Sequence, residues 1–371
     1  MEKALLRWGI VGTAEIARKN WKAIWNTKNG RVAAVASRDL ERSRRFIEQC
    51  QVEARFETPP KAFGSYEELL AATDIDAVYI PLPTGIRKQW VLRAADARKH
   101  VVCEKPCAIS VADLLEIIET CERNHVQFMD GVMFMHSSRL QRVRDALDDN
   151  QTIGTIRRIA SAFTFNAPQE FFTSNIRAQN ELEPHGCLGD LGWYCIRFAL
   201  WVQRGKLPRR VTGRALSEFR PQKSKPPVPT EFSGELFLDD GVSSAFYCSF
   251  LSEIEQWASV SGTRGSLRIP DFVLPFSGSE LLFETANPVY SICGCDFNLE
   301  PFNRRWTLPE HSHGHSDSQE TNLFRQFTDQ VRSGTLNSSW PDMALKTQLV
   351  MEACLKSARA HGQEIEVTPL E

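Results

Sequence analysis

A carboxylate, an ammonium group and a proline follow one of the most apolar short stretches of the chain. Glu104, Lys105 and Pro106 come directly after residues 101–103, a run typical of a buried strand. Burying either charge without a partner is costly, so both side chains are expected to face each other, a ligand or a solvent-filled cleft. An ordinary strand that ends in a polar loop is the alternative interpretation.

A glycine-containing turn stands where the first apolar run passes into a helical pattern. Gly12 and Ala17 occupy the first and third positions of the pattern G-x-G-x-x-G/A, and Ala14 replaces the second glycine. Such a turn lets backbone N–H groups at a helix N-terminus face a pyrophosphate. We therefore predict that Gly12, Thr13, Ala14 and Ile16 bind a dinucleotide. Because of Ala14, an ordinary turn between strand and helix remains the alternative.

Ser37 and Arg38 end the second apolar run, where NAD-binding sites usually carry an acidic residue that holds the ribose hydroxyls. A hydroxyl followed by a guanidinium would instead bind a 2′-phosphate through charge-assisted hydrogen bonds. This pair favours NADP(H) as the cofactor, with NAD(H) as the alternative. The other interpretation of Arg38 is a solvated surface side chain.

The elements that must position these residues form two halves with different rhythms. In the first 130 residues, strand-like runs alternate with helical patterns, and Ser65 and Ser110 open two of the helices with capping motifs. This alternation predicts an α/β Rossmann domain, a doubly wound parallel sheet, over residues 1–130. The strands are expected at 4–11, 31–37, 77–81, 101–104 and 127–131, and the helices from 16, from 65, and at 40–50, 87–98 and 110–122.

The second half has the pattern of an α+β domain over residues 131–371, with a large, mostly antiparallel open sheet. Asp239-Asp240-Gly241 is a hairpin signal, the stretch 221–229 is a proline-rich loop, and two helical patterns at 318–332 and 344–360 can pack back on the first domain. The strands are expected at 156–165, 211–217, 232–238, 243–250, 257–262 and 266–269.

Composition excludes several classes of protein. A net charge of −2, with basic residues spread along 371 positions, argues against a nucleic-acid or anionic-membrane surface. No apolar stretch is long enough to span a membrane, and residues 1–4 leave no room for a signal peptide before the first strand. The ten cysteines form no Cys-x-x-Cys pair, which indicates mostly buried free thiols and a cytoplasmic location.

Several segments, in order along nearly the whole chain, resemble the Gfo/Idh/MocA oxidoreductases. They are RWGIVGTAEIA, VAAVASRD, DAVYIPLPTG, KHVVCEKP, GCLGDLGWY, QETNLFRQF and LKTQLVMEACLKSAR. MDGVMFMHSSRL and GDLGWYCIR are similar to a branch near the dimeric dihydrodiol and the NADP-dependent D-xylose dehydrogenases. The resemblance implies a Rossmann domain and a second domain whose open sheet covers the active site and forms a homodimer or homotetramer interface.

The resemblance also implies site residues. Lys105 would lie beside the nicotinamide and a sugar-like substrate, oriented by Glu104 and by a cis peptide bond before Pro106. Pro83 and Thr84 would contact the cofactor. In the family mechanism, hydride passes between a sugar, polyol or dihydrodiol carbon and the nicotinamide while a side chain moves the hydroxyl proton.

Tyr194 stands where the related branch has its acid/base, four residues after Asp190, which would bind substrate or orient Lys105. A tyrosine hydroxyl ordinarily titrates near pH 10, so it needs a nearby cation to act near neutrality, and Lys105 would supply it. Asp190 as a helix cap and Tyr194 as a core residue form the alternative. Arg177 and His136 are candidate substrate-side residues.

Two sequence features and one alternative function bear on this interpretation. Arg87 stands where most relatives have histidine and either replaces that contact or faces solvent. His311, His313 and His315 lie in a polar loop without an evident third acidic or thiolate ligand, so we expect no metal site. The alternative function is a dinucleotide-binding redox sensor or scaffold without turnover, but the combination of Lys105 with Tyr194 favours an enzyme.

Overall fold

The computed structural model describes residues 5–220 and 226–369, and the chain forms two compact units. Unit 1 comprises Met1–His136, Glu181–Pro184 and His313–Gln348, and unit 2 comprises Ser137–Asn180, His185–Ser312 and Leu349–Glu371. The chain first passes from unit 1 to unit 2 after His136, whereas the predicted boundary lies after residue 130. Two later segments return to unit 1, so a single boundary in the sequence does not separate the two units.

Unit 1 is built on a six-stranded parallel sheet with the order β3-β2-β1-β4-β5-β6. The inner strands are buried along almost their whole length, which is the burial pattern of strands covered on both faces. The strand order reverses between β1 and β4, so a ligand crevice is expected at the carboxyl ends of these strands. The strands are β1 (Leu6–Val11), β2 (Gly30–Ala36), β3 (Lys61–Phe63), β4 (Ala77–Ile80), β5 (His100–Cys103) and β6 (Phe128–Asp130).

The helices of unit 1 begin where polar side chains cap them. The Ser65 hydroxyl accepts the Glu68 N–H, and the Ser110 hydroxyl accepts the Asp113 N–H, as the two capping motifs predict. The Glu68 carboxylate accepts the N–H of Gly64 rather than that of Ser65. The helices are α1 (Glu15–Thr27), α2 (Leu40–Glu53), α3 (Tyr66–Ala71), α4 (Thr84–Asp96), α5 (Val111–Arg123), the short 3₁₀ helix η1 (Met133–His136) and α9 (Gln319–Ser333).

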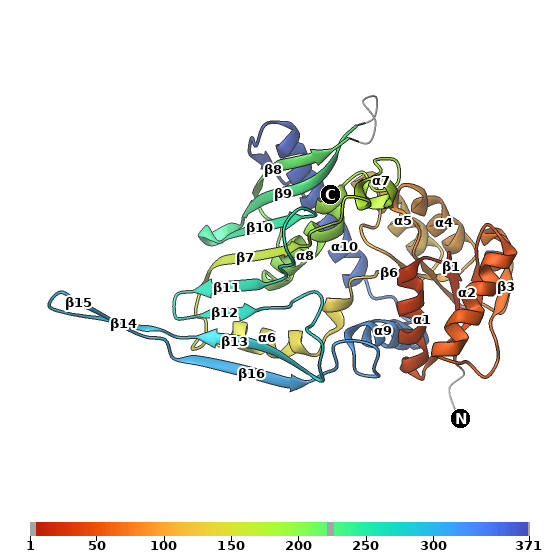
Figure 1. Cartoon of the computed structure of the whole chain (residues 1–371), viewed down its shortest axis with the longest axis horizontal. Helices are drawn as coiled ribbons and strands as arrows, with labels where there is room; N and C mark the ends of the chain where they lie inside the picture. Colours follow the sequence, from red (N-terminus) through yellow and green to blue (C-terminus); the bar gives the residue numbers. More distant parts are fainter. Residues whose placement is uncertain (1–4, 221–225, 370–371) are drawn as a thin grey trace. The chain divides into compact units, whose positions relative to one another are not determined.

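Helix α9 is the late segment that completes the unit 1 core. It lies beside α1 (Figure 1), and its Phe324 and Phe327 rings contact the buried indole of Trp8 in β1 at centroid distances of 5.2 and 5.3 Å. Leu323 joins the same buried cluster. Because Trp8 lies in a central strand, unit 1 needs this helix to cover one face of its sheet.

Unit 2 contains a nine-stranded mixed sheet with the order β16-β13-β12-β11-β7-β10-β9-β8-β17. Only β7 and β10 pair in parallel; the other pairs are antiparallel. Burial alternates along β9 and β10, so one face is packed and the other is open. The strands are β7 (Ile156–Thr164), β8 (Arg210–Phe219), β9 (Val228–Phe237), β10 (Ser243–Ser249), β11 (Ala258–Gly262), β12 (Ser266–Ile269), β13 (Glu280–Ala286), β16 (Asn303–Pro309) and β17 (Ile365–Glu366).

The packed face of this sheet is covered by helices. Helix α8 packs against β7 and β10, and α6 packs against β13. The predicted hairpin turn at Asp239–Gly241 (η4) joins β9 to β10, with Asp240 and Gly241 at positive φ. The other helices are α6 (Arg139–Asp148), α7 (Phe171–Ser174), η2 (Ile176–Ala178), the π-helical turn η3 (Leu188–Gly192), α8 (Trp193–Val202) and α10 (Ser339–Arg359), whose residues are shared between the two units.

Some elements differ from the sequence predictions. The predictions omitted β3, α6, α7, α8, β13, β16, β17 and the hairpin of β14 (Val289–Cys293) and β15 (Asp296–Glu300). Burial does not alternate along strands β14 and β15, because every residue in them is exposed. Of the predicted loop 221–229, residues 221–225 lie outside the described residues, and Val228 already belongs to β9; Ala4 of the first predicted strand also lies outside them.

The cysteines are free, as predicted, with eight buried and Cys293 and Cys295 exposed. Among the helices of the described segments, none combines the length and apolar character needed to cross a membrane.

Candidate active site

The turn between β1 and α1 has the geometry expected of a phosphate-binding loop. Gly12 has φ +114°, a conformation that favours glycine, and its N–H donates to the Ala36 carbonyl at 2.8 Å. Ala14 is the N-cap residue of α1 and supplies no side-chain hydrogen bond. The first N–H groups of this 13-residue helix therefore have no side-chain cap, which is the arrangement that suits an anion. Thr13 is half-buried, and Ile16 is exposed.

The end of β2 separates the roles of Ser37 and Arg38. The Ser37 hydroxyl is buried and donates to the Asp39 carbonyl at 2.6 Å, so it braces the turn. The Asp39 carboxylate accepts the Glu41 N–H at 2.9 Å and caps α2. Arg38 is exposed. The acidic residue nearest to this strand end is thus occupied as a helix cap, and Arg38 supplies positive charge.

Arg42 is a basic residue that the sequence predictions did not include. Its Nε donates to the Thr13 hydroxyl at 2.8 Å and so joins the first turn of α2 to the β1–α1 turn. Burial raises the pKa of the Tyr66 phenol, and the positive charges of Arg38 and Arg42 act against that rise. Arg42 lies in the first turn of α2, whereas Arg38 precedes the N-cap Asp39, so no helical spacing in the sequence links the two arginines.

At the end of β5, Glu104 is held by a buried tyrosine. The Tyr79 hydroxyl donates to Glu104 Oε1 at 2.6 Å, and Tyr79 is fully buried in β4. The pKa of Tyr79 lies well above its ordinary value, because burial and then the adjacent carboxylate disfavour the phenolate. The peptide bond between Lys105 and Pro106 is cis, as the family resemblance implies. Lys105 is half-buried directly after this fixed carboxylate.

Arg87 faces neither solvent nor a free cleft. Its side chain is buried, and its guanidinium donates to the carbonyl oxygens of Leu82 and Pro106 and, at 3.3 Å, to the Thr84 hydroxyl. Leu82 follows β4, and Pro106 follows β5. Arg87 therefore ties together the two loops that carry the predicted residues Pro83 and Lys105.

Thr84 is bound by a carboxylate from a segment 99 residues away. Its N–H donates to Glu183 Oε1 at 3.0 Å, and its hydroxyl donates to Glu183 Oε2 at 2.6 Å. Gly85 N–H donates to the Leu182 carbonyl at 2.8 Å. This distant cap explains why α4 begins at Thr84, three residues before the helix predicted from residue 87. The Thr84 hydroxyl, predicted to contact the cofactor, is engaged with Glu183.

Unit 2 brings the predicted residues Arg177 and Asp190 together. Arg177 Nε lies 2.8 Å from Asp190 Oδ2, and the Asp190 side chain is only 14% exposed. Asp190 lies in the π-helical turn η3, which continues directly into α8 with Tyr194. Residues four apart on a helical segment lie on the same side, and π-helical turns are frequent at functional sites. Tyr194 is 5% exposed and packs edge-on against Phe163.

A side chain at Gly192, at the end of this turn, would be crowded. A Cβ on Gly192 would stand 2.9 Å from Leu188 Cδ1 and 3.3 Å from Cys248 Sγ. The third residue of the Asp190-x-Gly192 motif therefore lets the turn approach β10 closely. The motif fixes the backbone between Asp190 and Tyr194.

His136 is a packed residue of unit 1. It is 7% exposed, its Nδ1 lies 2.8 Å from Gln326 Oε1, and its ring packs against Trp340. These contacts describe a side chain held inside unit 1, and its substrate role stays a prediction. The pairing of Lys105, in unit 1, with Tyr194, in unit 2, stays a prediction as well.

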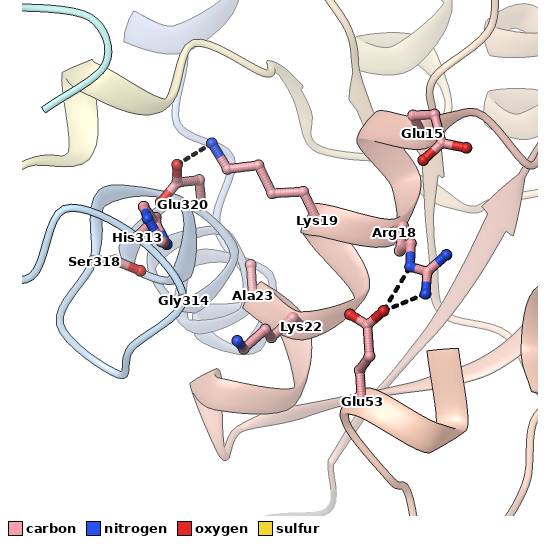
Figure 2. Close-up of a pocket in the computed structure, with 10 residues that line it drawn as sticks. All are labelled: Glu15, Arg18, Lys19, Lys22, Ala23, Glu53, His313, Gly314, Ser318 and Glu320. Atoms are coloured by element: carbon pink, nitrogen blue, oxygen red, sulfur yellow. Dashed lines mark hydrogen bonds and ion pairs between the residues drawn. The ribbon is translucent and has the colours of Figure 1, made fainter. Parts of the chain in front are cut away.

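A separate hollow of about 410 Å³ lies against α1, within unit 1, and has a mixed-charge lining (Figure 2). Two ion pairs, Arg18 with Glu53 and Lys19 with Glu320, balance most of that charge. His313 and Gly314 contribute from the histidine-containing loop. Across the segments described, no group of three or more His, Cys, Asp or Glu side chains is arranged to hold a metal ion. None of the predicted site residues lines this hollow.

Two family models match the chain in succession. The model described as an oxidoreductase family with an NAD-binding Rossmann fold, GFO_IDH_MocA, matches residues 6–132. The GFO/IDH/MocA C-terminal domain matches residues 140–268. The first match contains the whole parallel sheet of unit 1, and the second contains β7 to β11 and most of β12.

Two similar proteins are dehydrogenases. D-xylose 1-dehydrogenase (NADP(+)) 2 from Haloferax volcanii is 31% identical over 283 residues, which cover 76% of this chain and 81% of that protein. Trans-1,2-dihydrobenzene-1,2-diol dehydrogenase from Bos taurus is 29% identical over 268 residues, which cover 72% of this chain and 74% of that protein. Among solved structures, the 3-ketoreductase KijD10 from Actinomadura kijaniata, in complex with NADP and TDP-benzene, matches with a TM-score of 0.78 at 23% identity. That match covers 95% of this chain and 98% of KijD10 and shows a shared fold.

Proposed function

This chain belongs to the GFO/IDH/MocA oxidoreductase family, and on that premise we propose that it is an NADP(H)-dependent dehydrogenase or reductase. Its reaction is hydride transfer between the nicotinamide and a carbon that bears the hydroxyl or carbonyl group of a sugar, polyol or dihydrodiol. The dehydrogenases similar to it, which act on D-xylose and on a dihydrodiol, support this substrate class.

The observation that carries the cofactor assignment is the N-terminus of α1, which no side chain caps, with Arg42 bonded to the turn before it and Arg38 exposed at the end of β2. A pyrophosphate fits N–H groups that no side chain caps, and the hydroxyl of Thr13, in the turn before them, accepts a hydrogen bond from Arg42. Arg38 and Arg42 supply the charge that a 2′-phosphate requires, while Asp39 is engaged as the cap of α2. NADP(H) is therefore preferred over NAD(H).

The catalytic roles follow from how the side chains are held. Glu104, anchored by Tyr79, fixes the loop that carries Lys105 at the carboxyl end of β5. In unit 2, Asp190 pairs with Arg177 and orients substrate hydroxyls. Tyr194 moves the hydroxyl proton as the acid/base, assisted by Lys105. The nicotinamide, when bound, supplies the hydride chemistry.

We extend the proposal to assembly and location. The open face of the nine-stranded sheet serves as the contact in a homodimer or homotetramer, and the free thiols suit a cytoplasmic enzyme. Neither nucleic acid nor membrane is a partner.

The test combines single and double variants with a substrate panel. Purified protein is offered NADP(H) with aldoses, polyols and dihydrodiols, and nicotinamide absorbance is followed. Lys105→Ala and Tyr194→Phe should each lower turnover roughly 10²–10⁴-fold while NADP(H) affinity stays within about twofold. The double variant should be far less impaired than the product of the two single effects, because the groups act as one unit.

Tyr290→Phe is the matched control, since Tyr290 is exposed in the β14–β15 hairpin, and it should keep full activity. A Lys105→Ala enzyme with undiminished turnover on its best substrate would show that Glu104-Lys105-Pro106 is only a strand end. NADP(H) binding without turnover on any substrate of the panel would favour a sensor or scaffold.

A further inference from the structure

The β14–β15 hairpin projects from unit 2 beyond the ends of β13 and β16 (Figure 1). It forms a two-stranded sheet of its own, and all ten residues of its two strands are exposed. An isolated two-stranded hairpin is only marginally stable in water, because it has no further surface on which to bury side chains. This hairpin continues the pairing of β13 with β16 but buries little surface of its own, so a covering partner would stabilise it.

The strand register gathers the large apolar side chains on one face. Tyr290 pairs with Leu299, and Ile292 pairs with Phe297, so all four project to the same side. Their exposed fractions are 56%, 66%, 59% and 72%. The Tyr290 and Phe297 rings stack diagonally across that face at 6.2 Å. We call these four residues the arm face.

The opposite face of the hairpin has a different character. It carries one large apolar residue, Val289, together with Ser291, Cys293, Asn298 and two acidic residues, Asp296 and Glu300. Self-association through that side would bring acidic side chains together. The arm face holds no charged residue, so it can pack against an identical copy of itself without burying an unpaired charge.

We propose that the arm face is a contact between two copies of this chain related by a two-fold axis. A second copy is present whenever the chain is, so it covers the hairpin permanently, as a transient partner would not. The two aromatic side chains, 56% and 72% exposed, can together bury roughly 190–320 Å², a quarter to two fifths of the roughly 800 Å² per partner in a stable interface. The nearby exposed Phe302 adds to this area.

The proposal refines the self-association of unit 2 proposed above and is independent of the reaction. The test compares Ile292→Glu, on the arm face, with Ser291→Glu, its neighbour on the opposite face. Both side chains are exposed and the added charge is the same, so any loss of folding should be equal in the two variants. Molar mass is measured by light scattering on the full chain, with circular dichroism to verify folding.

The parent should have at least twice the chain mass of 42.1 kDa, and Ile292→Glu should halve the number of subunits while Ser291→Glu leaves it unchanged. A parent that is monomeric at every concentration would overturn both the arm contact and the sheet-face assembly. An oligomeric parent whose mass survives Ile292→Glu, or falls equally in both variants, would overturn the arm face alone.

The two exposed cysteines provide a second readout. Cys293 and Cys295 lie at the end of the hairpin, and the other eight thiols are buried. A nitroxide on Cys295, with Cys293→Ser, gives one label per chain, so a dipolar coupling can arise only from another copy. The coupling should be present in the parent and absent after Ile292→Glu, and its persistence in that variant would overturn the proposal.

Discussion

Replacing Arg87 by methionine should destabilise unit 1 far more than the loss of a single charge on the same helix. Arg87 Nε donates to the Leu82 carbonyl at 2.8 Å, and the other guanidinium nitrogens donate to Pro106, to Leu82 again and to Thr84. Methionine keeps most of the apolar stem but donates nothing. The carbonyls of Leu82 and Pro106 then lose their charged donor inside buried surroundings.

The magnitude follows from counting those carbonyls. A buried acceptor left without its donor costs about 1–3 kcal/mol, and bonds to charged groups stand at the upper end of that range. Two carbonyls give about 2–6 kcal/mol of lost unfolding free energy. The Thr84 hydroxyl lies 3.4 Å from the Pro106 carbonyl, but its single proton is donated to Glu183 at 2.6 Å, so it does not replace the lost donor.

Lys88→Met is the matched control, because it removes a charge from the adjacent residue of α4. Lys88 is about one-third exposed and pairs with Asp113 and Glu116, and such surface pairs are worth about 0–1 kcal/mol. Urea unfolding followed by tryptophan fluorescence compares the two midpoints. Turnover should also fall in Arg87→Met, since the bridged loops carry Pro83 and Lys105. Equal midpoints for Arg87→Met and Lys88→Met would refute the interpretation of Arg87 as a clamp.

Three further predictions concern other parts of the chain. Arg38→Ala should weaken NADP(H) binding by about 1–3 kcal/mol and leave NAD(H) binding nearly unchanged, as titration calorimetry would reveal. Arg42→Ala also releases Thr13, so it should weaken both cofactors but NADP(H) more; equal losses for both cofactors in either variant would contradict a 2′-phosphate role. Burial lowers the pKa of His100 below its ordinary 6.5, so below pH 6.5 the unfolded chain binds more protons than the folded chain. The contribution of His100 to stability should therefore be complete above pH 6.5 and be lost as pH decreases through the folded-state pKa. His100→Gln should flatten this pH dependence in thermal melts. Gly192→Ala should cost about 1–3 kcal/mol by unfolding midpoint, because its Cβ would stand 3.3 Å from a buried sulfur, whereas Gly278→Ala, with nothing closer than 4.0 Å, should cost much less.

Local sequence patterns were sufficient to predict the strands and helices of the Rossmann half and most strands of the second sheet. Continuous apolar runs predicted buried parallel strands, and serine caps predicted the starts of two helices, because both signals act within a few residues. The position of Gly12 and the family motif around Lys105 likewise follow from short-range sequence. The exposed strands β14 and β15 were missed, although their apolar residues alternate with polar ones and Gly294 stands between the two strands.

The sequence by itself determined which residue types stand at the strand ends and the family to which the chain belongs. Only the tertiary structure decided which side chains contact these residues. Arg42 bonds to Thr13 across 29 residues of sequence, Glu183 caps Thr84 across 99, and α9 covers Trp8 from the far end of the chain. Arg87 is indistinguishable from a solvated arginine in sequence, yet it bridges two carbonyls in a buried position. The reason is physical. A hydrogen-bond partner or a covering ring must lie close in space, and folding brings together residues that are far apart in the sequence, so local spacing does not predict these contacts.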